Sequence, residues 1–116
     1  MKRGDVVWAE FAPRSGSEQR GRRAAVIVSH DAFNGRMAWR SLVVVPVSTS
    51  PRQARRGPTV VSLDGAVSGL AATSVALCHQ VTTLDRAKLS APLGTLPQAK
   101  LAEVDAALRA ALDLTR

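Results

Sequence analysis

The sequence Leu42-Val43-Val44-Val45-Pro46-Val47 is the most strand-like part of the chain, because it is apolar throughout and rich in β-branched residues. A short apolar run of this kind predicts a β-strand that is buried on both faces. Pro46 has no N–H group to donate to a neighbouring strand, so we expect the pairing to meet an edge or a bulge there. The rest of the fold is predicted around this strand.

Shorter runs with strand character lie on both sides of it, separated by turn residues. They cover Val6–Ala9, Ala24–Ser29, Thr59–Leu63, Ser74–Leu77, Gln80–Leu84 and Ala91–Leu96. A helix is predicted from Pro97 to Leu112, because one apolar stripe recurs there at helical spacing, formed by Leu101, Val104, Leu108 and Leu112. Several short strands with one terminal helix indicate an α+β fold, mostly antiparallel β, built as a small barrel or rolled sheet.

The length of 116 residues suits one domain, spanning residues 1–116. No apolar run approaches the ~20 residues that cross a bilayer, and no signal peptide is evident, so we expect a cytoplasmic protein that does not bind a membrane. The single cysteine, Cys78, has no partner for a disulfide, and the two histidines, His30 and His79, are far apart. We therefore expect no metal ion and no other cofactor.

Positive charge is the first feature that points to a partner. The net charge is +7, and nine arginines against two acids fall between Arg14 and Arg56, which accounts for the whole excess. Guanidinium groups bind phosphate with two parallel hydrogen bonds and stack on bases, so this distribution favours a nucleic acid as the partner. Charge alone does not separate a nuclease from a DNA- or RNA-binding module without activity.

Polar residues gather in three segments that we predict as loops or loop ends: Gly16–Gln19 with Arg22-Arg23, Ser48–Ser50, and Cys78–Gln80. The chain has no phosphate-binding glycine motif and no G-x-S-x-G nucleophile turn. Arginine, hydroxyl and carboxylate groups remain, and these suit cleavage of RNA, which carries its own nucleophile in the 2′-hydroxyl. Fixed donors would stabilise charge on the phosphate, and Glu18 or His79 would move protons.

Five segments, taken in order along the chain, resemble the MazF/Kid/PemK toxins. The segment Arg3–Trp8 is similar to the family opening R-G-[DE]-[IV]-[YW], and Gly16–Arg23 is similar to its G-S-E-Q-x-G-x-R loop. The other three are Ser29–Asn34, Val45–Ser50 and Cys78–Asp85, which resemble S-P-x-x-[FY]-N, V-P-[VC]-T-[ST] and C-D-Q-[VI]-[RK]-T-[IL]-D. The resemblance covers nearly the whole chain.

The resemblance implies a homodimer of small SH3-like barrels of the CcdB/MazF type. It also implies a toxin of a type II toxin–antitoxin system that cuts single-stranded mRNA at short sequence motifs. Such an endoribonuclease leaves a 2′,3′-cyclic phosphate and a 5′-hydroxyl, and a cognate antitoxin inhibits it. A gyrase poison of the CcdB type shares the fold and is the alternative, although it leaves the Glu18–Arg23 loop and Ser48 without a purpose.

Residue by residue, the resemblance places Arg23 at the family's catalytic arginine, Glu18 at its loop glutamate and Ser48 at its catalytic threonine. Four positions depart from the pattern. Ala24 replaces a proline, Ser17 a histidine of the Kid branch, Leu77 an arginine and His79 an aspartate of Kid. The acid and base of Kid therefore do not transfer directly to this chain.

The remaining polar and basic residues of these segments are predicted to bind RNA: Ser17, Gln19, Arg22, Thr49, Ser50, Arg52, Arg55, Arg56 and Gln80. The chain has only four aromatic residues, so we expect little base stacking, and Trp8 and Trp39 are predicted in the core or an interface. The arginines between Arg14 and Arg56 are expected to line one channel, and the antitoxin to fill that channel with an acidic tail.

Overall fold

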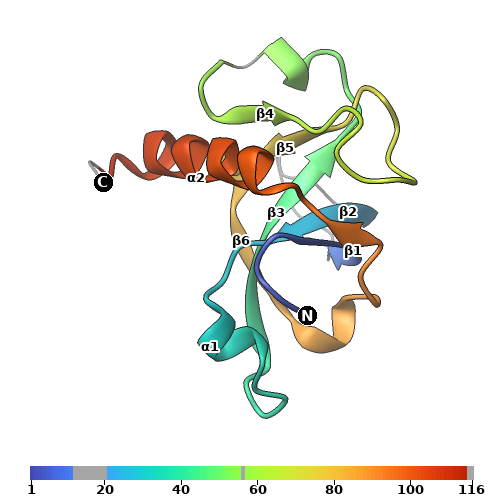
Figure 1. Cartoon of the computed structure of the whole chain (residues 1–116), viewed down its shortest axis with the longest axis vertical. Helices are drawn as coiled ribbons and strands as arrows, with labels where there is room; N and C mark the ends of the chain where they lie inside the picture. The colour runs from blue at the N-terminus through green and yellow to red at the C-terminus, as the bar shows by residue number, and fades with distance from the viewer. Residues whose placement is uncertain (12–20, 56, 115–116) are drawn as a thin grey trace.

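The computed structural model describes residues 1–11, 21–55 and 57–114. Strand β3 (Ser41–Ser48) forms the centre of the sheet, and all of its residues from 44 to 48 are buried. On one side it pairs with β2 (Gly21–Ile27), and on the other it pairs first with β6 (Thr82–Asp85) and then with β5 (Val75–Leu77). The predicted central strand is confirmed (Figure 1).

The interruption expected at Pro46 is a change of partner. The Val28 N–H donates to the Val43 carbonyl, so the hydrogen-bonded pairs with β2 fall at residues 43 and 45. The Pro46 nitrogen therefore points away from β2, towards the side on which β3 passes from β6 to β5. The N–H that proline lacks would point to the gap between β6 and β5, where no described strand pairs with β3.

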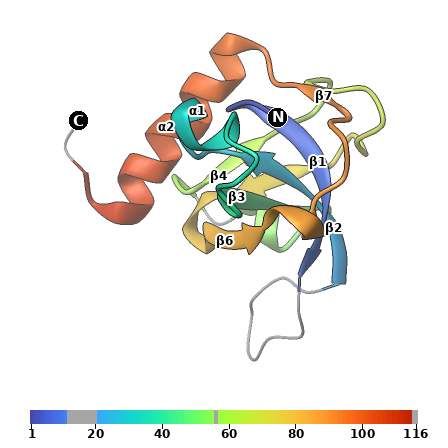
Figure 2. The same cartoon turned by 90° about the horizontal axis from the view of Figure 1, so that it is seen from below.

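The other strands extend the sheet at both edges. Strand β1 (Asp5–Phe11) pairs with β2 and with the short β7 (Gly94–Thr95), and β4 (Val60–Ser62) pairs with β5. The order is β4-β5-β3-β2-β1-β7, with β6 also on β3, and the pairings are antiparallel. The sheet curls into a half-barrel, so the predicted fold class is confirmed (Figures 1 and 2).

Helix α2 (Gln98–Leu112) lies against one face of the sheet (Figure 2). Val104 is fully buried there among residues of β2, β3 and β5, whereas Leu112 is 53% exposed. The predicted helix is confirmed, but Leu112 does not belong to the core. The other face of the sheet carries a second apolar cluster, formed by Val7, Ala9, Phe11, Ala25, Ile27, Leu42, Val44 and Leu84.

Arg3 and Gly4 hold α2 against the sheet. The Arg3 guanidinium donates to the Asp105 carboxylate of α2 at 2.6 Å and to the Val28 carbonyl at 2.9 Å. Gly4 has φ +92°, and an added Cβ would lie 3.2 Å from a Leu101 methyl group, so glycine suits this position for two reasons. The Arg-Gly pair of the opening motif therefore has a structural role.

Four short helical turns were not predicted: α1 (Asp31–Asn34), η1 (Gln53–Arg55), η2 (Cys78–Gln80) and η3 (Arg86–Lys88). Such turns are too short to show a helical period in the sequence. Strand bounds also differ from the prediction. Strand β2 begins at Gly21 rather than Ala24, which places Arg22 in a strand instead of a loop, and the strand predicted over Ala91–Leu96 is only Gly94–Thr95.

Trp39, predicted in the core or an interface, is 45% exposed and therefore does not belong to the core. Its ring packs on Phe33 with ring centres 4.7 Å apart, at the corner that follows α1. No helix in the described part of the chain is long and apolar enough to cross a membrane.

Candidate active site

Arg23 and Ser48 lie near the neighbouring ends of β2 and β3. Strands β2 and β3 pair Ile27 with Val44 and Ala25 with Pro46. Arg23 lies two residues before Ala25 on β2, and Ser48 lies two residues after Pro46 on β3, so both side chains point to the face of that pair. In this ladder the even-numbered residues of β3 form the non-hydrogen-bonded pairs, in which facing side chains are closest. The two residues with matched family roles thus share one face of the sheet.

The Ser48 side chain is nearly covered, with 4% of its surface exposed, and its hydroxyl oxygen accepts a hydrogen bond from the Ser50 N–H at 3.1 Å. That bond uses a lone pair and leaves the O–H free to donate. Arg23 is exposed, although its side chain also makes an interaction within the molecule. This face therefore carries one exposed guanidinium and one oriented hydroxyl.

The face that carries Arg23 and Ser48 continues across the sheet to a cavity of about 530 Å³. The side chains on this face form a row from strand to strand. Ser48 pairs with Val75, and Val75 pairs with Ser62, so these side chains lie on one face. The cavity is lined by Val75 and Ser62 of that row, by Val60 and Thr73 beside them, and by Pro51, Ala54 and Arg55 of the segment that covers them. Arg52 is exposed in the same segment. This face offers a path from Arg23 to Arg55 for an extended anionic chain.

Arg22 and Thr49 face the opposite side of the sheet, because neighbouring residues in a strand alternate. There the Arg22 guanidinium lies over the Trp8 indole, 5.4 Å from the ring centre. A second cavity, of about 250 Å³, is lined by Trp8, Arg22, Thr49 and Leu70 among others, and Arg23 borders it as well. Arg22 and Thr49 thus line one cavity and Arg55 lines the other, so these three predicted RNA-binding residues are divided between two cavities.

His79 and Gln80 lie elsewhere. Ser48 pairs with Val75 at the start of β5, whereas His79 lies in η2, two residues after the last residue of that strand. Its Nδ1 forms a hydrogen bond of 3.1 Å with the Thr59 hydroxyl. The structure therefore does not bring His79 and Gln80 beside Arg23 and Ser48.

Cys78 is fully buried, and burial raises the pKa of its thiol to about 12. A thiol in that state is not a nucleophile at neutral pH.

Four of the predicted site residues, Ser17, Glu18, Gln19 and Arg56, lie outside the described residues. Within residues 1–11, 21–55 and 57–114, no three histidine, cysteine, aspartate or glutamate side chains gather into a possible metal site.

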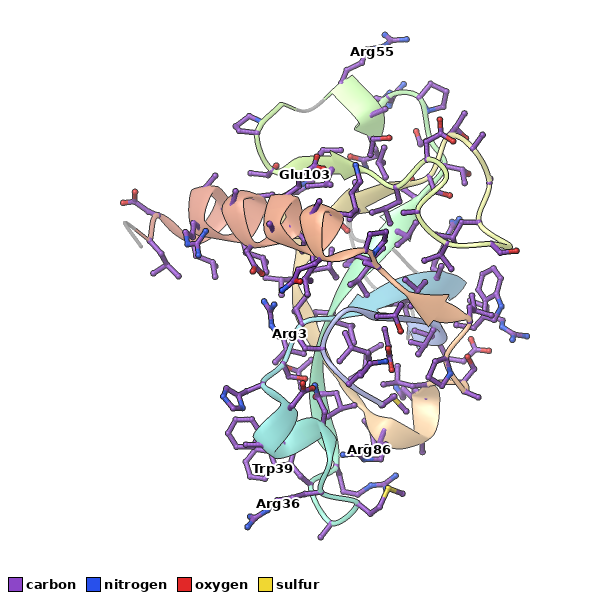
Figure 3. All side chains as sticks on the ribbon, viewed as in Figure 1. Arg3, Arg36, Trp39, Arg55, Arg86 and Glu103 are labelled. Atoms are coloured by element: carbon purple, nitrogen blue, oxygen red, sulfur yellow. The ribbon has the colours of Figure 1, made fainter. Side chains whose placement is uncertain are left out.

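The sequence suggested that the nine clustered arginines line one channel. The described arginines of this group do not all lie on one surface. Arg36 and Arg55 lie at opposite ends of the molecule (Figure 3). Arg40 follows Arg36 in the corner after α1 and donates to the Asp85 carboxylate at 3.1 Å. The cause is the path of β3, whose eight residues separate the corner at its start from the basic segment after its end.

Comparisons with known proteins identify relatives of this chain. Residues 2–112 match the family described as the PemK-like, MazF-like toxin of type II toxin–antitoxin systems. The chain is 36% identical over 114 residues to the endoribonuclease MazF of Staphylococcus epidermidis, covering 98% of this chain and 92% of that protein. It is 33% identical over 117 residues to the endoribonuclease MazF9 of Mycobacterium tuberculosis, covering 98% of each.

Solved structures of similar fold include MazF from Deinococcus radiodurans, with a TM-score of 0.80, 31% identity and coverage of 98% of this chain and 97% of that one. Another is a mycobacterial endoribonuclease in complex with its cognate antitoxin, with a TM-score of 0.74, 25% identity and coverage of 100% and 98%.

Proposed function

The chain belongs to the PemK-like, MazF-like toxins of type II toxin–antitoxin systems, and we propose that it cleaves single-stranded mRNA at a short sequence motif without a metal ion. It is an endoribonuclease of the MazF type. The observation that supports the finer proposal is that Arg23 of β2 and Ser48 of β3 share one face of the sheet, on which the pairings of Ser48 with Val75 and of Val75 with Ser62 lead to a cavity bordered by Arg55.

The chemistry follows from the groups at that place. The RNA 2′-hydroxyl attacks the adjacent phosphorus, and the bond from phosphorus to the 5′-oxygen breaks. The products are a 2′,3′-cyclic phosphate and a 5′-hydroxyl. Arg23 and the Ser48 hydroxyl donate hydrogen bonds to the phosphate oxygens as negative charge builds on them, an effect worth a few kcal/mol per donor.

Two protons must also move, one from the 2′-hydroxyl to a base and one from an acid to the departing 5′-oxygen. In this proposal Glu18 takes the first proton and, as the carboxylic acid that results, returns a proton through water to the departing 5′-oxygen. His79, whose Nδ1 forms a hydrogen bond with the Thr59 hydroxyl, is given no proton in this proposal.

Substitution of Arg23 tests the proposal. Arg23→Ala is expected to slow single-turnover cleavage of an RNA oligonucleotide by at least ~100-fold, the scale for one lost transition-state donor, whereas RNA affinity falls far less. Arg23→Lys is expected to rescue poorly, since an ammonium lacks the planar fork of a guanidinium. Arg40→Ala is the matched control, an exposed arginine of the same basic stretch at the other end of β3.

Cleavage is measured in excess EDTA, and the fragment ends are identified by whether a kinase phosphorylates the new 5′-hydroxyl directly. Near-wild-type activity of Arg23→Ala would refute the assignment. Activity that is lost on chelation and restored by magnesium would refute the proposed chemistry.

We also propose that the active protein is a cytoplasmic homodimer held inactive by an antitoxin with an acidic tail. Titration of that antitoxin against toxin carrying a labelled deoxy analogue of RNA tests the mode of inhibition. Release of the label in proportion to bound antitoxin is expected, because the tail would cover the basic face that ends at Arg55. A ternary complex that retains the label contradicts inhibition by occupancy.

A further inference from the structure

We propose that Trp8 and Arg22 form a nucleobase pocket that sets which base is accepted next to the cleaved bond. This inference rests on the proposed RNA cleavage and adds a recognition site to it. It also replaces the expectation that Trp8 belongs only to the core or to an interface.

The first argument is the geometry of the pair. Trp8 is partly buried and packs against the core through one part of its ring, while the Arg22 guanidinium lies over the ring at 5.4 Å. The contact joins two planar groups, one from the middle of β1 and one near the start of β2, where Arg22 is exposed. Flat surfaces of this kind bind bases, because every base has a planar π face.

The second argument is the space around the pair. Trp8 and Arg22 together line three of the described cavities, of which the one of about 250 Å³ has the clearest chemistry. Its apolar part is formed by Ala24, Val47, Leu70 and Ala71, and its polar part includes Thr49 and Ser74. The described residues that line it include two arginines and no carboxylate. Such a lining suits a flat ring with polar edges that is attached to a phosphate.

The third argument is the position of this cavity relative to the chemistry. Arg22 precedes Arg23, and Thr49 follows Ser48, so each residue of the proposed catalytic pair has a direct neighbour in the pocket. Arg23 borders the cavity itself. An RNA strand that passes around the end of β2 and β3 therefore places one phosphate at Arg23 and Ser48 and the base of an adjoining nucleotide against Trp8 and Arg22.

Charges near the pair support an anionic ligand. Glu10 lies across from Arg22 on β1 and lines a neighbouring cavity, and Lys88 lines the same one. Glu10 is the only carboxylate among the described residues around these cavities, which are also lined by Arg22, Arg23 and Lys88.

The test couples removal of a base to substitution of the pocket. A set of RNA oligonucleotides, each with one abasic nucleotide near the cleaved bond, is cleaved by wild type, Trp8→Leu and Arg22→Gln. In the wild type, one abasic position is expected to raise KM by about 10-fold, the range for one stacked base. In either variant the same abasic position is expected to add less than 3-fold, because the stacking partner is already absent.

Trp8→Phe is the second variant, used if Trp8→Leu does not fold. Phenylalanine keeps an aromatic face, so the abasic position should still raise KM, but by less than in the wild type. A binding readout uses Trp39→Phe, which leaves Trp8 as the only tryptophan and alters an exposed residue at the other end of β3. A non-cleavable deoxy oligonucleotide is expected to quench the fluorescence of Trp8, and its abasic form is expected to quench less.

Equal abasic penalties in the wild type and in both pocket variants overturn the pocket while leaving the proposed function intact. Failure of the wild type to cleave any of the oligonucleotides overturns the proposed function itself.

Discussion

Arg86 should be one of the largest single contributors to stability, although nothing in the sequence singled it out. Only 6% of the residue is exposed. Its guanidinium donates five hydrogen bonds of 2.8–3.2 Å to the backbone carbonyls of Phe33, Asn34, Arg36 and Trp39. One side chain therefore holds the whole corner between α1 and β3 (Figure 3).

Arg86→Met keeps the volume and removes every donor. Leaving one buried carbonyl without a donor costs about 1 kcal/mol when the smallest usual penalty is taken. Four carbonyls at this penalty give about 4 kcal/mol, which we use as the upper value. The corner lies at the surface, and water will reach some of these carbonyls, which reduces the expected loss to about 2–4 kcal/mol. For a chain of this size the loss corresponds to a fall in melting temperature of about 8–16 °C.

Urea unfolding of wild type, Arg86→Met and Arg86→Lys measures the effect. Arg86→Lys is expected to be nearly as destabilising, because an ammonium offers three donors at one point and does not span four carbonyls. Arg40→Met is the control, since Arg40 forms a surface pair with Asp85 in which both side chains are about half exposed, and it is expected to cost under ~1 kcal/mol. Full stability of Arg86→Lys would show that charge alone matters and would refute the reasoning.

Two further predictions concern buried titratable groups. Burial raises the pKa of Asp5, but hydrogen bonds from the Thr95 hydroxyl and from Lys2 outweigh it, so its folded pKa lies below 3.8. Its stabilisation is therefore present above pH ~4 and is lost as the pH falls through the folded pKa. Urea titrations at several pH values should show Asp5→Asn destabilised by about 1–3 kcal/mol near neutrality, with a smaller difference in acid. The buried Cys78 thiol, with its pKa raised to about 12, should react with a thiol reagent at pH 8 only at the rate of unfolding, and rapid reaction in native buffer contradicts this burial.

The fold was predictable because its strongest signals are local. The apolar run from Leu42 to Val47 and the stripe from Leu101 to Leu108 need no knowledge of distant residues to predict a strand and a helix. The short turns α1, η1, η2 and η3 were missed, since each depends on contacts with residues far along the chain. Arg86 shows this plainly, because its carbonyl partners lie roughly fifty positions earlier in the sequence.

The candidate site was predictable by residue type and less so by place. Sequence order suggests that Arg22 and Arg23, or Ser48 and Thr49, act as units. Side chains alternate along β2, so Arg22 and Arg23 point to opposite faces. The register of β2 on β3 places Arg23 on the face of Ser48, whereas Arg22 lies over Trp8, and both arginines border the cavity that Thr49 lines.

This alternation has a consequence for how such an enzyme links recognition to cleavage. Two consecutive residues on one strand are held at a fixed separation by the backbone, so a base bound at Arg22 fixes the phosphate at Arg23 without a flexible connection between them. Thr49, the residue after the end of β3, lines the same cavity as Arg22. Positioning of this kind reduces the freedom that is lost at the transition state. An enzyme whose nucleophile is supplied by the substrate gains most from it. In the proposed binding mode, with a base at Arg22 and a phosphate at Arg23, one end of β2 thus sets base choice on one face of the sheet and chemistry on the other.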